Sequence, residues 1–287
     1  MRFELDRDHR DFATSLDALL SAADTPAAAR AWAGGDHAPG LELWGKLVDQ
    51  GVTSLADNDL GADPVFLMVA FERLGYHAVP GPWVESVAYL ARTGGIATVA
   101  LPPVVPYALD ADIADEVYVG DTLVADRGAL HNSVDGTRRL FEVPGSAEID
   151  RVAFDRAVCA VSAQLVGLGE RILDDSVSYV KQRRQFGREI GSYQVIKHKL
   201  ADVRIALDFA RPLVFGAALG AISPSAAKVA CGDAAYLAAR TGLQVHGAIG
   251  YTQEFDLSIW ITKVRALVTA WGTPAYHRAR VLEGLVG

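Results

Sequence analysis

Apolar residues recur at every third or fourth position through residues 3–92, and this spacing predicts a series of amphipathic helices. Asp63 followed by Pro64 is typical of a helix start, because the aspartate caps the first turn and a proline fits into it. One more short helix is expected at residues 84–92. The apolar stripes are Phe12, Leu16, Leu19 and Leu20; Leu43, Leu47 and Val48; and Val65, Met68, Val69 and Leu74.

The pattern changes after Gly94 and Gly95. Three stretches rich in β-branched or aromatic residues follow, with prolines and turn residues between them, at residues 96–101, 117–124 and 139–143. Such stretches predict strands joined by turns. A segment this short supplies only a few strands, so we expect a small β insert.

The helical period returns after Pro144 and Gly145 and continues to the end of the chain. Alanine and glycine are frequent there, and small residues let neighbouring helices approach closely. The fold is therefore predicted to be mostly α with a small β insert. The expected parts are an N-terminal helical domain at residues 1–93, a truncated β segment at 94–146 and a C-terminal antiparallel four-helix bundle at 147–287.

Composition narrows the class of protein. The chain has 287 residues, of which 51% are hydrophobic, and this content argues for a sizeable core and against intrinsic disorder. Its net charge of −8 disfavours a nucleic-acid partner, because binding to phosphates needs a basic surface. The N-terminal residues hold no apolar signal core, and the longest apolar stretch, Phe209 to Ile222, is interrupted by Arg211 and Pro212. We therefore expect a cytoplasmic protein without a membrane segment.

Common catalytic and metal-binding motifs are absent from the sequence. It has no GxxxxGK[ST] loop, no GxGxxG after a predicted strand and no GxSxG elbow. Its seven histidines are scattered, and neither CxxC nor HxxxH occurs, so no metal site is expected. Cys159 and Cys231 lie in apolar helical stretches and are interpreted as buried free thiols rather than a disulfide or metal ligands.

One candidate binding feature is the run of residues 183–187, Arg-Arg-Gln-Phe-Gly, with Gln194 after it. Taken alone it has a structural interpretation, because Gly187 is a natural helix terminator and arginines in a last turn complement the helix dipole. The same residues also suit anion recognition. A guanidinium matches diphosphate oxygens, and Phe186 offers a ring for stacking.

A second feature is the run of residues 244–251, Gln-Val-His-Gly-Ala-Ile-Gly-Tyr, which follows a long predicted helix at residues 225–243. Its two glycines suit a simple turn between helices. They also suit a close approach of the backbone to a flat or charged ligand, with the Gln244 amide as donor and acceptor.

Taken together, the two features give the sequence a resemblance to the acyl-CoA dehydrogenase family. The likeness runs over roughly residues 155–285 and extends to Phe71-Glu72-x-Leu74-Gly75 and Pro80-x-Pro82 in the N-terminal part. The matching positions of the two features are Arg183, Gln185, Phe186, Gly187 and Gln194; His198, Leu200, Ala201 and Asp202; and Gln244, Gly247 and Gly250.

The resemblance implies an FAD flavoprotein that removes two hydrogens from the α and β carbons of an acyl-CoA thioester. In that family the helical bundle mediates dimerisation, and these motifs reach the FAD bound mainly by the neighbouring subunit. The residues to which the resemblance assigns FAD contacts are Arg183, Gln185, Phe186, Gln194, Gln244, Val245, Gly247 and Ala248.

Two departures from the family pattern bear on activity. The family's β domain is longer and carries a TEPxAGSD-like stretch, which this β segment lacks. The family's catalytic glutamate precedes a Gly-Thr pair, but here Trp271 does, and an indole is no general base. The family's alternative position for the base falls on Ala157. The nearest carboxylates on the same predicted helix are Asp155 and Glu170, and a small misregister would bring Asp155 into place.

We therefore expect a subunit of a heteromeric acyl-CoA dehydrogenase that has no catalytic residue of its own. It would share FAD with a full-length partner subunit in a heterodimer or heterotetramer. The C-terminal Gly272-Thr273-Pro274 and His277-Arg278-x-Arg280 resemble actinobacterial subunits that act on steroid side-chain acyl-CoA thioesters. Three alternatives stay open: a homomeric dehydrogenase with a relocated base, an acyl-CoA-binding relative without redox chemistry, and a structural subunit without a ligand. The sequence identifies neither the acyl group nor the electron acceptor.

Overall fold

The computed structural model describes residues 5–57, 61 and 63–286. The N-terminal part is helical, as predicted, and the Asp63 carboxylate caps α4 by accepting from the backbone N–H of Val65 at 2.9 Å. Helix α2 is not among the predicted elements, and the expected short helix at 84–92 is a π-helical turn, η3. The elements are α1 (Arg7–Ala22), α2 (Thr25–Ala33), α3 (Ala38–Asp49), η1 (Val52–Ser54), α4 (Pro64–Tyr76) and η3 (Val84–Tyr89).

The β insert forms two sheets of three strands each. In the first, β1 pairs with β3 in parallel and β3 pairs with β4 antiparallel; in the second, β6 lies between β2 and β5. The predicted strand at 117–124 is two strands, because Gly120 takes a positive φ of 64° and turns the chain back. The strands are β1 (Ala97–Ala100), β2 (Ala108–Leu109), β3 (Glu116–Val119), β4 (Thr122–Val124), β5 (Ala129–His131) and β6 (Leu140–Glu142).

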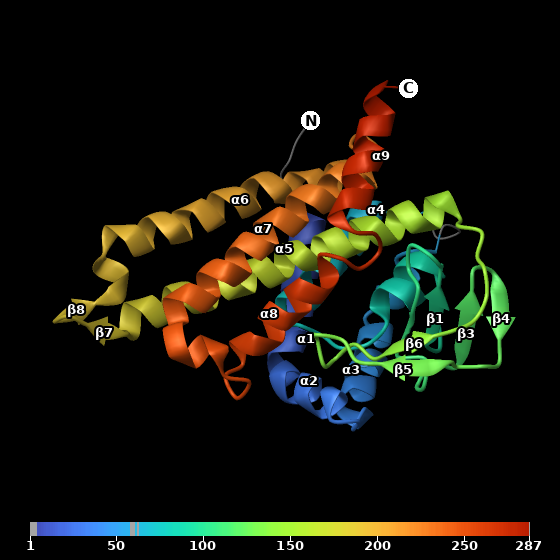
Figure 1. Cartoon of the computed structure of the whole chain (residues 1–287), viewed down its shortest axis with the longest axis horizontal. Helices are drawn as coiled ribbons and strands as arrows, with labels where there is room; N and C mark the ends of the chain where they lie inside the picture. The colour runs from blue at the N-terminus through green and yellow to red at the C-terminus, as the bar shows by residue number, and fades with distance from the viewer. Residues whose placement is uncertain (1–4, 58–60, 62, 287) are drawn as a thin grey trace.

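The C-terminal part is a bundle whose helices α5, α6 and α7 run side by side along the long axis of the molecule (Figure 1). The two sheets lie at one end of this axis and the small β7–β8 hairpin lies at the other (Figure 1). The elements are α5 (Arg151–Gln182), β7 (Arg184–Gln185), β8 (Arg188–Glu189), η4 (Ile190–Ser192), α6 (Gln194–Ala218), α7 (Pro224–His246), η5 (Gly247–Tyr251), α8 (Leu257–Leu267) and α9 (Pro274–Val286). The predicted order of helices, short strands and helical bundle is confirmed.

Helix α5 is the centre of the molecule and contacts α4, α6, α7 and α8. By length and composition it is the one described helix that could cross a membrane, but 83% of its apolar window is buried inside the fold. The apolar segment long enough to cross a membrane is therefore α5, and not the stretch at 209–222. The burial of α5 is typical of a core helix. Cys159 on α5 and Cys231 on α7 are buried free thiols, as expected.

Helices α4 and α5 touch backbone to backbone. A Cβ placed on Gly167 would lie 1.9 Å from the carbonyl oxygen of Glu72, and one placed on Gly75 would lie 2.2 Å from that of Gln164. The N-terminal helices and the bundle consequently share one hydrophobic core. Because the core is continuous, the domain boundaries at residues 93 and 146 stay predictions from the sequence.

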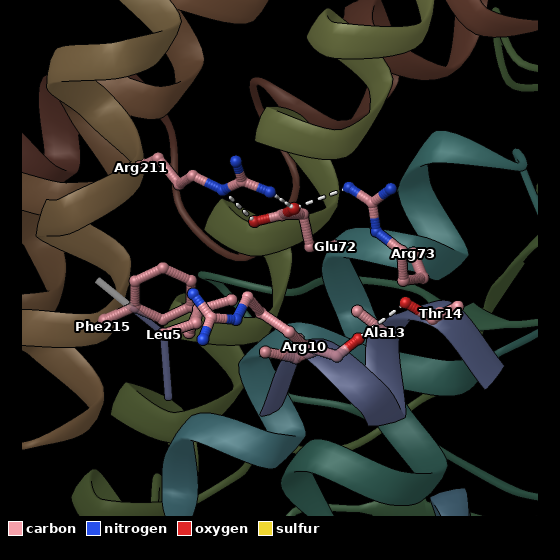
Figure 2. A pocket seen from close by; sticks show the side chains of 9 residues that line it. Leu5, Arg10, Ala13, Thr14, Glu72, Arg73, Arg211 and Phe215 are labelled. Carbon is pink, nitrogen blue, oxygen red and sulfur yellow. Dashed lines mark hydrogen bonds and ion pairs between the residues drawn. The ribbon is translucent and has the colours of Figure 1, made fainter. Parts of the chain in front are cut away.

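A buried charge cluster joins α4, α5 and α6 beside a cavity of about 580 Å³. Figure 2 shows the guanidinium groups of Arg73 and Arg211 approaching the carboxylate of Glu72 from opposite sides. The Arg73 Nη2–Glu72 Oε1 distance is 2.6 Å and the Arg211 Nε–Glu72 Oε2 distance is 2.9 Å. Arg73 also reaches Glu170 on α5 at 3.2 Å. These charges neutralise one another, so the cluster ties helices together and offers no free charge to a ligand.

Candidate functional site

The first sequence feature forms a hairpin at the end of α5. Arg183 is the C-cap of α5, and β7 and β8 pair antiparallel directly after it. Phe186 and Gly187 form the two-residue turn with φ values of +53° and +82°, the left-handed pair that tight hairpins use. The hairpin lifts the Phe186 ring away from the protein, and this side chain is 91% exposed.

The second feature closes helix α7 beside this hairpin. Tyr179, one turn before Arg183 on α5, stacks on His246 with ring centroids 4.3 Å apart. Lys199 on α6 donates from Nζ to Oε1 of Gln244 at 2.8 Å. Gly247 ends α7 with a φ of +62°. The two features, 61 residues apart at Arg183 and Gln244, thus meet at the end of the bundle far from the sheets (Figure 1).

The expected cofactor-contact residues differ in what they present. Val245 is buried, so it can offer only its backbone, and a Cβ on Gly247 would meet nothing within 4 Å, which leaves its backbone approachable. The other members of the set are exposed: Arg183, Gln185, Phe186, Gln194, Gln244 and Ala248.

The chemistry of these side chains fits the nucleotide end of FAD. Within the described chain, the Arg183 guanidinium and the Gln194 amide make no hydrogen bond or ion pair. Because Lys199 occupies the oxygen of Gln244, the amide NH2 of Gln244 stays available as a donor. A free guanidinium and free amide donors are what diphosphate oxygens bind, and the bare Phe186 ring is a surface for stacking.

An apolar face on α6 and α7 adjoins this set. Its exposed side chains include Phe209 at 77% and Val195 at 61%. Gln244 lies seven residues after the exposed Leu237, so both project from the same side of α7. We call this surface the α6–α7 face; its members are Val195, Ile205, Phe209, Tyr236 and Leu237.

Neither position that the family uses for its proton acceptor carries a carboxylate. Trp271 is 1% exposed with a φ of +57°, and Ala157 is fully buried. Asp155, the candidate for a relocated base, is held by Arg280 at 2.9 Å. Glu170 belongs to the charge cluster and also binds Arg204 at 3.3 Å. Both carboxylates are therefore engaged in ion pairs.

The structure places beside Trp271 a carboxyl group that was not among the residues predicted from the sequence. Glu85 on η3 is 1% exposed, and its Oε1 accepts from the indole Nε1 of Trp271 at 3.2 Å. Burial raises the pKa of Glu85, which favours the protonated form, and a protonated carboxyl group accepts no proton. The signal in the sequence was a single acidic residue in the mostly apolar run at 83–91.

The chain is similar to one protein-family model and to curated proteins of nearly its own length. Residues 149–286 match the family model described as acyl-CoA dehydrogenase, C-terminal domain. The acyl-CoA dehydrogenase IpdE2 of Mycolicibacterium smegmatis is 30% identical over 298 aligned residues, which cover 93% of this chain and 95% of that protein.

Solved structures with the same fold include two that pair differently named chains. The ChsE4–ChsE5 complex from Mycobacterium tuberculosis has a TM-score of 0.76 at 21% identity and covers 100% of this chain and 99% of that chain. A variant of the Tcur3481–Tcur3483 steroid ACAD has a TM-score of 0.82 at 19% identity, and the match covers 98% of this chain and 99% of that chain.

Helices, small sheets and bundle together define an acyl-CoA dehydrogenase fold. The chain belongs to the acyl-CoA dehydrogenase family, and it is similar to IpdE2 over nearly its whole length. The predicted resemblance and fold class are confirmed. The residue-by-residue FAD contacts stay predictions.

Proposed function

We propose that this chain is a non-catalytic subunit of a heteromeric, FAD-dependent acyl-CoA dehydrogenase. The complex would oxidise the Cα–Cβ bond of an acyl-CoA thioester in the cytoplasm. The observation that carries the proposal is the exposure of six members of the cofactor-contact set beside the exposed α6–α7 face. Groups placed in this way complete a site only when another subunit covers them.

Three residues of the set have a definite task in this proposal. Arg183 would pair with the diphosphate, the Gln244 NH2 would donate to the nucleotide end, and the Phe186 ring would stack against it. FAD, when bound, supplies the acceptor for the two electrons. Trp271 and Ala157 offer no acceptor for the α proton, so that proton would pass to a carboxylate of the partner.

The proposed partner is a full-length acyl-CoA dehydrogenase subunit that covers the α6–α7 face. The ChsE4–ChsE5 neighbour, which is a complex, supports this choice. The Tcur3481–Tcur3483 neighbour, described as a steroid ACAD, supports a bulky acyl group such as a steroid side chain as the substrate. The assembly would be a heterodimer or heterotetramer.

The flavin content of the complex tests this function. We would co-express the chain with the acyl-CoA dehydrogenase encoded beside it, purify the complex and count FAD by absorbance after denaturation. One FAD per pair of subunits is expected, and two would contradict the proposal. The chain purified alone is expected to be colourless. If it were yellow and an acyl-CoA bleached it, it would be a homomeric dehydrogenase instead.

A further inference from the structure

The loop at residues 251–256 joins η5 to α8 and directly follows the second half of the cofactor-contact set. Five of its six residues are exposed. Its own hydrogen bonds stay local, because Thr252 bonds to Ile249 and Ser258 bonds to Gln253 and Phe255. A segment with so few buried contacts opens easily unless another part of the molecule holds it.

Arg30 on α2 holds this loop, although 224 residues separate it from Glu254 in the sequence. Its Nη2 donates to the backbone carbonyl of Glu254 at 3.0 Å, and its Nη1 lies 2.5 Å from Oδ1 of Asp256. Figure 1 shows the loop before α8 beside α2. Within the described chain, Arg30 is the one residue outside 249–258 that forms a hydrogen bond or ion pair with the loop.

Asp256 serves this contact rather than the helix that follows it. An aspartate directly before a helix ordinarily accepts a backbone N–H of the first turn. Here the side chain of Asp256 makes no such bond to α8 and faces the Arg30 guanidinium instead. One exposed ion pair contributes little, but a guanidinium with two acceptors on one loop fixes that loop at two points.

The loop passes its position on to the cofactor-contact set through aromatic rings. Phe255, between the two residues that Arg30 holds, packs on His246 with ring centroids 5.4 Å apart. His246 in turn stacks on Tyr179, which lies one turn before Arg183 on α5. His246 also directly precedes Gly247, whose positive φ forms the turn with the open backbone. Movement of Phe255 would therefore loosen both halves of the set.

We propose that Arg30 is a positioning residue for the FAD site. By holding the loop at 251–256 it keeps Phe255 against His246, and so it fixes the Gly247 turn that the nucleotide end of FAD approaches. The inference rests on the proposed function, because it requires that FAD meets this end of the bundle. The N-terminal helices then contribute to cofactor affinity without touching the cofactor.

The FAD affinity of the assembled complex tests the inference, measured by titration of the FAD-free complex with flavin fluorescence as the signal. Arg30→Ala should weaken FAD binding by about three-fold, within the range of one exposed ion pair. The double variant Arg30→Ala/Asp256→Asn should bind FAD as Arg30→Ala does, because both changes break the same contact. The matched control is Arg7→Ala on α1, which removes the same charge from an ion pair with Asp11 and should bind FAD as wild type does.

A second readout follows the loop itself and needs no cofactor. Chymotrypsin cleaves after aromatic residues, and Phe255 is partly buried while it packs on His246. In the full chain without FAD, Arg30→Ala should increase the rate of cleavage after Phe255, measured by mass spectrometry. The Arg7→Ala chain should be cleaved there at the rate of wild type.

The outcomes separate this inference from the function on which it rests. If Arg183→Ala weakens FAD binding and Arg30→Ala does not, the inference is wrong and the proposed function stands. If neither change weakens it, both are wrong. The route through the loop is also overturned if the double variant adds the full Asp256→Asn loss to that of Arg30→Ala, or if Arg30→Ala weakens FAD binding without faster cleavage after Phe255.

Discussion

At the scale of single residues, Arg183 is the side chain on which cofactor sharing most depends. Its guanidinium is exposed and unpaired within the described chain, whereas the neighbouring Arg184 lies in the same hairpin outside the family's matching positions. We predict that Arg183→Ala lowers the FAD content of the complex, because a charge-assisted hydrogen bond contributes about 1.5–3 kcal/mol, or at least ten-fold in affinity. FAD absorbance after gel filtration measures it.

The matched control is Arg184→Ala, which removes the same charge from the same hairpin and should leave the FAD content near that of wild type. Equal FAD in both variants and in wild type would contradict the assignment. It would favour a structural subunit that makes no contact with the cofactor.

Residue-level prediction from the sequence succeeded where the information was local. The Asp63 cap and Pro64 at the start of α4 lie next to each other in the chain, and the helix start follows from their residue types. The β7–β8 hairpin was not predicted, because Gly187 was interpreted as the end of a helix and Phe186 rarely takes a positive φ. Glu85 was missed because its partner Trp271 is 186 residues further along the chain. The burial that changes the chemistry of Glu85 exists only once these two segments meet.

At the scale of elements, the contact between α4 and α5 depends on glycine. We predict that Gly167→Ala destabilises the protein by about 3 kcal/mol, because its Cβ would collide with the backbone of Glu72 and no flexible side chain can move aside. Gly45→Ala on α3 is the control. A Cβ there meets nothing within 4 Å, so the change should be neutral or stabilise by up to about 1 kcal/mol through helix propensity. Denaturant unfolding measures both, and equal stabilities would contradict the close packing.

Elements in which the apolar pattern continues over many residues were predictable from the sequence, and short elements were not. Helices α5 to α9 were predicted from a helical apolar period, and tertiary packing buries most of α5. On α7 the buried face is rich in alanine, whereas Asp233 and Leu237 are exposed. Helix α2 was missed although Asp24 caps it and Pro26 lies in its first turn. Strands β2 and β5 have only two and three residues, so sheet pairing and not local pattern creates them.

At the scale of the whole molecule, His277 links the stability of the fold to pH. The imidazole is fully buried between Ser225 on α7 and the Trp271 carbonyl. Burial, with the nearby Lys228 charge, lowers the pKa of His277 from 6.5 to about 4. The unfolded chain therefore binds the extra proton first as pH falls, and the stabilisation present above pH 6.5 is lost progressively toward pH 4.

We predict that wild type loses up to about 3 kcal/mol more unfolding free energy than His277→Gln between pH 7 and pH 4.5. The comparison with the variant cancels the contributions of other groups. Parallel pH profiles for the two proteins would contradict a neutral, buried His277.

The identity of the partner subunit is the property that the sequence of one chain constrains least. The motifs around Arg183 and Gln244 indicate a nucleotide, and the structure adds that both lie beside the exposed α6–α7 face. Which surface covers that face depends on a second chain. The sharing of FAD between this chain and a partner subunit therefore stays a proposal.

The reduction of flavin by acyl-CoA in the assembled complex tests most directly the claim that this chain has no proton acceptor. Replacing the partner's catalytic glutamate by glutamine should abolish the bleaching in a stopped-flow experiment with a panel of saturated acyl-CoA thioesters. Asp155→Asn in this chain should leave the bleaching rate unchanged. If a neutral substitution of any carboxylate of this chain, Glu85 included, abolished the bleaching while FAD stayed bound, the account would be wrong.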